Sequence, residues 1–509
     1  MKILLVYPKY PETFWGFQHA LKLVAKTAAY PPLGLLTVAA MLPEKWEKKL
    51  VDMNATNLTE KDIIWADYVF ISAMVVQGKS VKEIIARCKK LNTKIVAGGP
   101  VFTTGYDEFD GVDHFVLGET EVILPSFLSD LEKGCARHIY IADEFPDITQ
   151  SPIPSWSLID LRKYSAMPIQ YSRGCPFNCE FCDIIILNGH NPRTKDTEQV
   201  LAELESLYAN GWREAVFFVD DNFIGNKKKL KKEVLPAIIE WMKERNYPFT
   251  FLTESSVNLA DDDELMRLMV EAGFNRVFIG IETPNEESLE ECNKFQNKNR
   301  DLVASVKKIQ NYGLEVQGGF IVGFDSDPLS IFKNQVSFIQ KSGIVTAMVG
   351  LLNAPRGTQL YHRLEKENRL LKGMSGDNMD FSMNFIPKMN HDTLINGYKH
   401  ILNTIYSPSQ YYERIKTFLK EFKPERKGRR SKLQYYHLRA LFKSMWLLGV
   451  RGKGKRYYWN FIASVLLKHP RSFPLSVTLT VYGFHFRKVV DKYIEIPNKN
   501  ILDMEQASS

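Results

Sequence analysis

Residues 171–182 read Tyr-Ser-Arg-Gly-Cys-Pro-Phe-Asn-Cys-Glu-Phe-Cys, and this C-x3-C-x2-C spacing is the most informative stretch of the chain. Cys175, Cys179 and Cys182 supply three thiolates where a cuboidal 4Fe-4S cluster usually takes four. One iron of such a cluster would stay open to an outside ligand. Two alternatives remain open from the spacing alone: a zinc site with His190 as its fourth ligand, and three buried structural cysteines.

The cysteine loop follows the first of six short apolar runs that alternate with helical patterns. The runs lie near residues 168–171, 215–219, 249–253, 276–281, 316–322 and 347–352. One helix between them is expected to begin at Asp196, because Gln199 follows three residues later as a capping signal. Six such strand–helix units over about 190 residues predict three quarters of a (β/α)8 barrel.

Polar and acidic residues follow these runs where each predicted strand ends. In a barrel of this kind the carboxyl ends of the strands form the active-site face. The predicted ends carry Asp220-Asp-Asn, Thr253-Glu-Ser, Glu282-Thr and the glycine-rich run 318–325. A single carboxylate at a strand end is usually a cap or a solvated group, but its recurrence on successive strands predicts a functional face.

The first 140 residues or so show the same alternation, with apolar runs at 3–7, 49–52, 68–73, 94–98 and 114–118. Runs that are apolar throughout predict a parallel sheet covered on both faces, here a doubly wound α/β domain of about five strands. Ligands of such sheets bind beyond the carboxyl ends of the strands, where this chain carries Ser72, Gly98, Gly99, Gly118 and Glu119. Glycine allows a ligand to approach the backbone closely, although a tight turn would also explain Gly98-Gly-Pro.

The chain has 509 residues, of which 45% are apolar and 25% charged, so we expect several domains of a soluble protein. The expected division is 1–142 for the first domain, 143–160 for a proline-containing linker, 161–365 for the barrel and 366–509 for a basic, mostly helical accessory region. No apolar stretch approaches the ~20 residues that a bilayer crossing needs. The start of the chain lacks a signal-peptide cleavage region, and six cysteines in so long a chain require no disulfide framework, so a reducing cytoplasm is expected.

Over residues 1 to about 365, the chain resembles the radical S-adenosylmethionine (SAM) proteins that carry a cobalamin-binding domain. Within that class it is most similar to the hopanoid methylases and their uncharacterised relatives. The resemblance rests on the cysteine loop and on the runs 191–195, 219–225, 278–284 and 319–325. One departure is that no Asp-x-His-x-x-Gly motif follows the first strand, so no histidine is available there as a lower ligand to cobalt.

The resemblance implies a set of site residues but no catalytic residue. It places the 4Fe-4S cluster on Cys175, Cys179 and Cys182; SAM against Phe181, Glu254, Glu282, Gly319 and Gly323; and cobalamin against Ser72, Gly98, Gly99, Gly118 and Glu119.

The implied function is that of a cobalamin-dependent radical SAM methyltransferase acting on an unactivated carbon of a lipid-like substrate. Such a carbon has no lone pair with which to attack SAM, which is why two cofactors would be needed. The alternatives are a radical enzyme that forms a ring or another C–C or C–H bond without methyl transfer, and a non-catalytic metal-binding or RNA-associated protein. A methylthiotransferase is disfavoured because the first domain has only Cys88 and Cys135 instead of a second triad; these two and Cys292 are interpreted as structural or incidental.

The net charge of +7 is concentrated in residues 411–460, which contain fifteen Lys or Arg against three Glu. Aromatic and aliphatic residues are interleaved with these charges, among them Phe418, Leu419, Phe442 and Trp446. The pattern favours contact with an anionic membrane surface. Docking of an acidic reductant of the flavodoxin or ferredoxin type, a solvated helical region without a partner and, least favoured, RNA binding are the alternatives. We therefore expect a cytoplasmic protein that can associate with the cytoplasmic face of a membrane.

Overall fold

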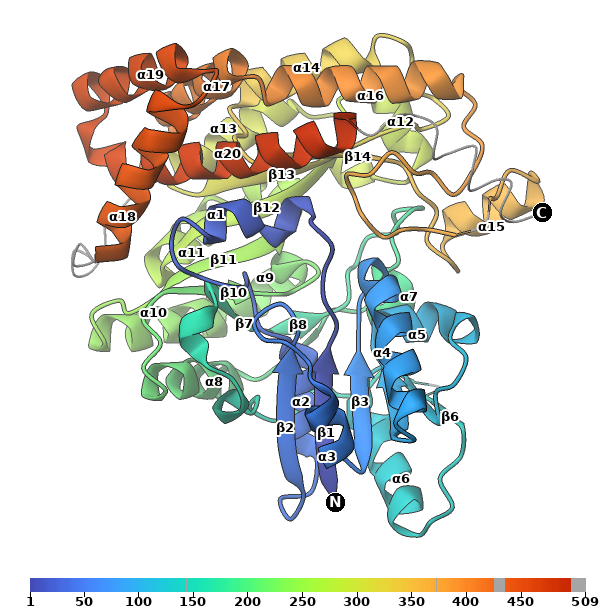
Figure 1. The fold of residues 1–509 in the computed structure, drawn as a ribbon. Helices are drawn as coiled ribbons and strands as arrows, with labels where there is room; N and C mark the ends of the chain where they lie inside the picture. The colour runs from blue at the N-terminus through green and yellow to red at the C-terminus, as the bar shows by residue number, and fades with distance from the viewer. Residues whose placement is uncertain (143, 372, 425–434, 496–509) are drawn as a thin grey trace.

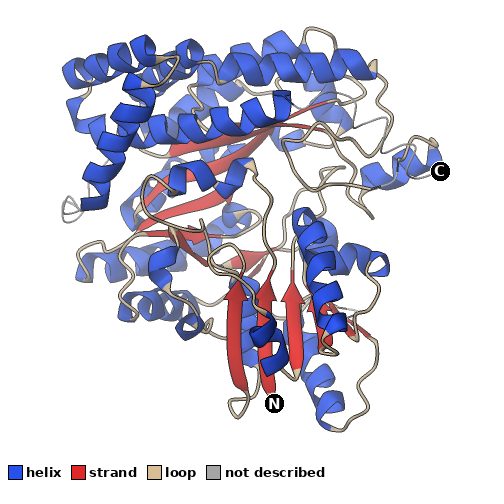
Figure 2. Cartoon of the chain, in the orientation of Figure 1, coloured by secondary structure: helices blue, strands red, loops and turns tan. Residues whose placement is uncertain are grey.

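The computed structural model describes residues 1–142, 144–371, 373–424 and 435–495 (Figure 1). Two parallel six-stranded sheets follow one another along the chain, and helices near the C-terminus cover the second sheet (Figure 2). The predicted fold class, a doubly wound sheet followed by a partial barrel and a helical region, is confirmed. Among the described helices, none combines the length and the apolar character needed to cross a bilayer.

The first sheet has the strand order β2-β1-β3-β4-β5-β6, with all pairs parallel. Its strands are β1 (Lys2–Tyr7), β2 (Glu47–Asp52), β3 (Tyr68–Ser72), β4 (Lys94–Gly98), β5 (His114–Leu117) and β6 (Ile139–Ile141). Leu4 and Val6 face a core shared with α3 (Glu60–Trp65), α4 (Gly78–Lys90) and α5 (Pro100–Gly105). Ile3 and Leu5 face α2 (Leu33–Met41) and α6 (Thr120–Glu132), so both faces of the sheet are buried.

The expectation of about five strands in this domain missed β6. This strand has three residues, pairs only with β5 at the edge of the sheet, and leaves Ile141 60% exposed. Its three residues, Ile139, Tyr140 and Ile141, are all apolar, but a run this short is below the usual length of a strand and does not stand out in the sequence.

The second sheet has the order β14-β13-β12-β11-β10-β7, again all parallel, which confirms the six predicted strands. They are β7 (Ala166–Ile169), β10 (Ala215–Phe218), β11 (Thr250–Ser255), β12 (Phe274–Glu282), β13 (Glu315–Val322) and β14 (Ala347–Leu351). The helices between them are α7 (Ile184–Asn188), α8 (Thr197–Ala209), α9 (Lys227–Lys229), α10 (Leu235–Glu244), α11 (Asp263–Ala272), α12 (Glu286–Glu291), α13 (Leu302–Asn311) and α14 (Ile331–Ser342). Helix α8 begins with the predicted capping box of Asp196 and Gln199. A short antiparallel ribbon, β8 (Ser172–Arg173) with β9 (Arg193–Thr194), brackets the cysteine loop.

The C-terminal region consists of α15 (Gln359–Lys366), α16 (His391–Ile405), α17 (Pro408–Glu421), α18 (Tyr435–Ser444), α19 (Lys455–Lys468) and α20 (Phe473–Glu495). Helix α16 covers the open edge of the barrel: the hydroxyl of Tyr398 donates to the Val349 carbonyl of β14 over 2.8 Å. Phe418 and Leu419 were among the residues expected to contact a membrane surface. Both lie on α17 and are buried in the core. Part of the basic segment is therefore core, and residues 425–434 of it lie outside the described residues.

The connection after β1 runs across to the other end of the chain, where helix α1 (Gln18–Leu21) lies beside α20 (Figure 1). Phe14 stacks on Phe486 with 4.1 Å between ring centroids, and a ring nitrogen of the buried His485 lies 2.9 Å from the Phe14 carbonyl oxygen. The first domain and the C-terminal helices thus share one packed interface around the second sheet.

Candidate cofactor sites

The cysteine loop leaves the end of β7 and is fixed at its start by backbone contacts. Gly174 has a φ of +96°, and a Cβ at this position would lie 2.8 Å from the Asn191 carbonyl oxygen. The Gly174 amide donates to Asp221 over 2.8 Å, and the Cys175 amide donates to the Gly189 carbonyl over 3.2 Å. A left-handed backbone and the lack of room for a side chain explain why glycine precedes the first cysteine.

The three cysteines are free thiols; Cys179 is buried, while Cys175 and Cys182 are half-buried. Burial raises the pKa of the Cys175 and Cys182 thiols, so metal binding there would displace their protons. The Gln296 side chain lies 3.7 Å from the Cys179 sulfur. Within the described residues no three His, Cys, Asp or Glu side chains are gathered at metal-ligating separations, whether these cysteines alone or together with His190.

The acidic pair after β10 holds the cysteine loop in place. Asp220 is buried and accepts hydrogen bonds from the Tyr171 amide and from the amide and hydroxyl of Ser172. Burial raises the pKa of Asp220 to about 7 in spite of these donors. Asp221 accepts from Gly174 and, over 2.9 Å, from the Asn188 side chain. These two carboxylates are thus occupied by the loop that precedes and follows the first cysteine.

The two glutamates predicted to contact SAM differ in their surroundings. The side chain of Glu254, near the end of β11, has no hydrogen-bond or ion-pair partner among the described residues. Burial, together with the nearby carboxylates of Asp221 and Asp220, raises the pKa of Glu254 to about 8. Glu282, at a bulge where β12 ends, has a φ of +62° and forms an ion pair of 2.7 Å with Lys294. Glu254 is the carboxyl group that remains available to a ligand.

Lys294 was not singled out from the sequence. Burial alone would lower its pKa, but the charge of Glu282 and the neighbouring Cys179 raise it above its ordinary value. Cys175 and Cys182 also lie within its electrostatic reach, so a cation is placed close to all three cysteines. Its sequence context after α12 gives no signal of this, because the contact depends on the tertiary fold.

The remaining predicted SAM contacts lie where the inner strands approach one another. The Phe181 ring packs against Phe324, with centroids 6.2 Å apart. Gly319 lies on β13, where a Cβ would stand 2.8 Å from the Phe278 ring of β12. Gly323 has a φ of +109°, and its amide donates to Asp327 over 2.8 Å. Both glycines occupy positions that a larger residue could not take without displacing a neighbour.

A cavity of about 340 Å³ lies at the carboxyl edge of the first sheet, and all five residues predicted to contact cobalamin line it. Gly99 has a φ of +90°, and a Cβ there would overlap the Ser72 hydroxyl; at Gly98 a Cβ would lie 2.7 Å from the Val116 carbonyl oxygen. The cavity extends to Gln170 and Val219, which directly follow β7 and β10 of the second sheet. These glycine-lined walls fit a large ligand that binds against the backbone, as cobalamin would. In the described part of the chain no histidine lines this cavity, in line with the missing motif.

Glu119 is also part of an ion-pair network that crosses between the two sheets. Its carboxylate pairs with both Arg173 and Arg193, and Arg173 further pairs with Glu121 over 2.8 Å. Arg173 stands two residues before the first cysteine and was missed by the sequence analysis, although a charged residue in that position is a visible signal. The network ties the loop after β5 directly to the start of the cysteine loop.

Comparisons with known proteins agree with this arrangement. Residues 23–128 match the family model of the B12 binding domain, residues 169–334 that of the radical SAM superfamily, and residues 358–498 a domain of unknown function (DUF4070). The chain is 43% identical to an uncharacterized methyltransferase of Synechocystis sp., over 99% of this chain and 96% of that protein. It is 33% identical to the hopanoid C-2 methylase of Rhodopseudomonas palustris, over 92% and 90% of the two chains.

Solved structures share the fold at low sequence identity. The cobalamin-dependent SAM radical enzyme OxsB with aqua-cobalamin bound aligns with a TM-score of 0.61 at 16% identity, over 98% of this chain and 81% of that one. The radical SAM methyltransferase TsrM from Kitasatospora setae aligns with a TM-score of 0.57 at 16% identity, over 73% and 77%.

Proposed function

The chain belongs to the cobalamin-dependent radical SAM methyltransferases, and from that membership we propose that it methylates an unactivated carbon of a lipid-like substrate. Its cofactors are a 4Fe-4S cluster, SAM and cobalamin. A cluster held by Cys175, Cys179 and Cys182 would supply the electron for reductive cleavage of SAM and, through it, removal of a hydrogen atom from the substrate, and cobalamin would supply the methyl group. A flavodoxin or ferredoxin is the reductant we expect.

We assign the cofactors to the residues described above and keep the division of the chain proposed from its sequence. The cluster is assigned to Cys175, Cys179 and Cys182; SAM to Phe181, Glu254, Glu282, Gly319 and Gly323; and cobalamin to Ser72, Gly98, Gly99, Gly118 and Glu119. In this scheme Asp220 and Asp221 orient the cysteine loop, and Arg173 fixes the spacing between the cluster and the corrinoid through Glu119 and Glu121.

The observation that carries the substrate class is a second cavity of about 230 Å³ beside the first. Its walls are mainly aromatic and aliphatic, with Tyr30, Phe217, Leu33 and Pro168 among them. It shares Ser72, Pro100 and Val219 with the larger cavity, so an apolar group inside it would lie next to the proposed corrinoid. The similarity to a hopanoid methylase supports a lipid-like molecule as the occupant.

The products of turnover test the proposed reaction. One SAM is consumed in forming the radical and a second provides the methyl group, so 5′-deoxyadenosine and S-adenosylhomocysteine should form in about equal amounts. Anaerobic turnover with a membrane lipid extract, followed by mass spectrometry of both nucleosides and of lipids heavier by one methylene, measures this. If 5′-deoxyadenosine forms only with the lipid extract and no S-adenosylhomocysteine appears, the result would favour a radical reaction without methyl transfer.

Glu254 predicts a pH dependence of SAM binding. Its folded-state pKa of about 8 lies above the ordinary 4.5, so the group carries a proton at neutral pH. SAM brings an ammonium and a sulfonium cation, which favour the ionised carboxylate, so binding must expel that proton below pH 8. Affinity should therefore rise by up to about tenfold per pH unit between pH 6 and 8 and level off above.

Calorimetric titration of SAM in buffers of different ionisation enthalpy measures both the affinity and the released proton. Glu254→Gln should weaken binding and flatten the profile. Asp220 titrates in the same range and keeps its own hydrogen bonds in this variant. A slope that survives Glu254→Gln would assign the proton to another group and reject Glu254 as the SAM ligand.

Two helices near the C-terminus support the membrane contact that we propose. Phe442, Trp446 and Val450 recur every four residues along α18 and its continuation, and each is more than half exposed. On α19, Leu466 is 51% and Leu467 84% exposed. We call these five residues the apolar corner. Exposed cations on the same stretch of chain include Arg451, Lys455, Arg456 and Lys468, and residues 435–471 contain no Asp or Glu. Exposed apolar side chains interleaved with cations suit an anionic lipid surface.

Sedimentation with liposomes tests this contact. Vesicles with anionic lipid should bind the protein, and Trp446→Asp with Leu467→Asp should reduce binding by at least about tenfold, because each change removes apolar burial and adds repulsion. Ile64→Asp is the matched control, since Ile64 is 65% exposed on α3 of the first domain. Equal sedimentation of the double variant and the wild-type protein, or equal binding to neutral vesicles, would contradict the proposal.

A further inference from the structure

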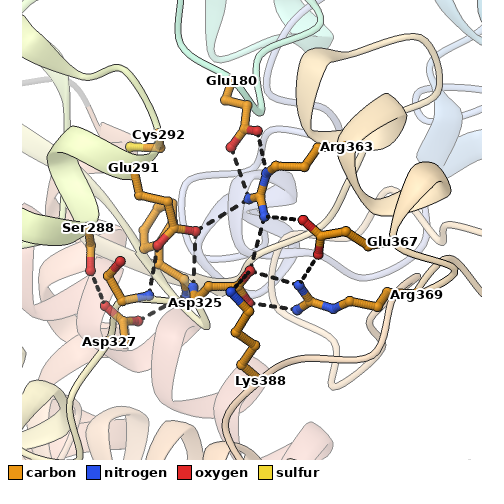
Figure 3. Close-up of polar contacts among 12 residues, drawn as sticks. Glu180, Ser288, Glu291, Cys292, Asp325, Asp327, Arg363, Glu367, Arg369 and Lys388 are labelled. Atoms are coloured by element: carbon orange, nitrogen blue, oxygen red, sulfur yellow. Dashed lines mark hydrogen bonds and ion pairs between the residues drawn. The ribbon is translucent and has the colours of Figure 1, made fainter.

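An ion-pair network joins the cysteine loop to helix α15, outside the barrel strands (Figure 3). Glu180 stands between Cys179 and Phe181 in the loop, and its side chain is 11% exposed. The Arg363 guanidinium grips this carboxylate with two hydrogen bonds, from Nε over 2.6 Å and from Nη2 over 3.1 Å. A two-pronged arginine–carboxylate pair in a nearly buried setting fixes both position and orientation.

Helix α15 also holds the main chain of the loop. The Leu360 amide donates to the Glu180 carbonyl over 2.9 Å, and the Gln359 side chain donates to Asn178 over 2.8 Å. On the opposite side, the Glu180 amide donates to the Cys292 carbonyl over 3.0 Å. The residue next to Cys179 is therefore bound through its amide, its carbonyl and its side chain, and two of these three contacts come from α15.

The other edge of the Arg363 guanidinium reaches the ends of two further segments. Its Nη1 donates to Asp325, which follows β13, over 3.0 Å, and its Nη2 lies 3.4 Å from Glu291 at the end of α12. Asp325 is shared with Arg369, whose Nη2 donates to it over 2.6 Å. Burial would raise the pKa of Asp325, but the two arginines lower it to about 2, so the carboxylate stays charged at any physiological pH.

Within this network, Arg363 contacts three segments: the cysteine loop, the residues that follow β13 and the end of α12. Lysine could replace it only in part, because the four carboxylates paired with Arg363 lie in different directions and match the planar fork of a guanidinium better than a single ammonium group. The contact was invisible in the sequence: Glu180 and Arg363 are 183 positions apart, and Arg363 lies in the region that matches a domain of unknown function.

We infer that the C-terminal region is part of the cluster site and that Arg363 is a positioning residue for the cysteine loop, acting through Glu180. The inference rests on the proposed ligation of the cluster by Cys175, Cys179 and Cys182. Without Arg363, Glu180 would be a nearly buried carboxylate without its cation, and the loop would open to hydrate it. The second and third cysteines flank Glu180, so their spacing would be lost with it.

Hydrogen exchange on the cluster-free protein directly tests whether Arg363 holds the cysteine loop through Glu180. Arg363→Met should speed exchange of the amides at 177–182 by about 10- to 100-fold, the range expected for losing hydrogen bonds to a charged group. Arg363→Lys should speed exchange by an intermediate factor. Glu180→Gln should also speed it by an intermediate factor, similar to that of Arg363→Lys. Arg245→Met is the matched control, because Arg245, at the end of α10, pairs with Glu205 of α8 and Glu244 of α10, and within the described residues it has no hydrogen bond or ion pair with the cysteine loop. Unchanged exchange in the loop, or a uniform increase over the whole chain, would overturn the inference.

A second measurement uses the reconstituted, reduced enzyme. With SAM bound, Arg363→Met should broaden the electron paramagnetic resonance spectrum of the cluster and speed the loss of iron to a chelator, and the double variant Glu180→Gln/Arg363→Met should be no worse than either single one. Additive losses would overturn the pairwise mechanism. If the proposed cluster ligands were wrong, the wild-type protein would show no four-iron signal while the exchange result would stand, so the two failures can be told apart.

Discussion

Replacing Cys182 with alanine should lower 5′-deoxyadenosine formation by a factor of about 1,000 or more, and Cys175→Ala and Cys179→Ala should do the same. The three thiols lie in one loop between β8 and β9, and groups that act as a unit each cost nearly the full activity when removed. Losing one ligand should also remove the brown absorption of the cluster. Anaerobic reconstitution, iron analysis and quantification of deoxyadenosine after addition of dithionite and SAM measure the effect.

Cys135→Ala is the control for this series, since Cys135 is an exposed free thiol in the first domain. It should leave both the absorption and the cleavage of SAM intact. Retained SAM cleavage in any of the three loop variants would reject the assignment of the cluster to these cysteines.

Gly99→Val should weaken the affinity for cobalamin by about 100-fold or more, so that cobalamin is lost on gel filtration. The cluster and its absorption should remain. The backbone at Gly99 has a φ of +90° and a ψ of 178°, a region essentially restricted to glycine, which costs a residue with a side chain about 1–3 kcal/mol. The added Cβ would overlap the Ser72 hydroxyl and lie 3.3 Å from the Ala73 amide nitrogen, in the wall of the larger cavity. Corrinoid content after reconstitution and gel filtration, with iron content measured on the same sample, gives the result.

Gly134→Val separates backbone strain from obstruction of the cavity. Gly134 has a φ of +72° and open space where a Cβ would stand, so it shares the positive φ of Gly99 without the close neighbours. This control should bind cobalamin as the wild-type protein does. Equal loss of corrinoid in both variants would mean that strain alone is responsible, and full retention in Gly99→Val would place the ligand elsewhere.

The parts of the fold that depend on local pattern could be predicted from the sequence. The buried strands of both sheets show as continuous apolar runs, and the capping box of α8 shows as Asp196 followed by Gln199. The edge strand β6 was missed because its apolar run, Ile139 to Ile141, is only three residues long and does not stand out as a strand. Phe418 and Leu419 were misplaced for a related reason: an aromatic residue among lysines can face either a core or a surface, and only packing decides.

The candidate site divides in the same way. Strand ends bring Ser72, Gly98 and Gly99 to one cavity because parallel strands end at a common edge. The partners of the charged residues were not predictable. Glu282 pairs with Lys294, and Glu119 with arginines of the cysteine loop's own ribbon. Such pairs join segments that are far apart in the sequence, so the periodic pattern of apolar residues does not predict them. In the sequence their members look like ordinary surface charges.

The stacking of Phe14 on Phe486 has a consequence for the order of events during synthesis. Phe14 and its hydrogen-bond partner His485 are 471 positions apart, so the first of them leaves the ribosome long before the other exists. The first domain can form its sheet early, and Trp15 finds Phe278 of β12 once the second sheet exists, but Phe14 lacks its stacking partner until α20 has been translated. Because contacts between distant positions form late and slowly, the packing of residues 14–21 against α20 belongs to the last steps of folding of these segments.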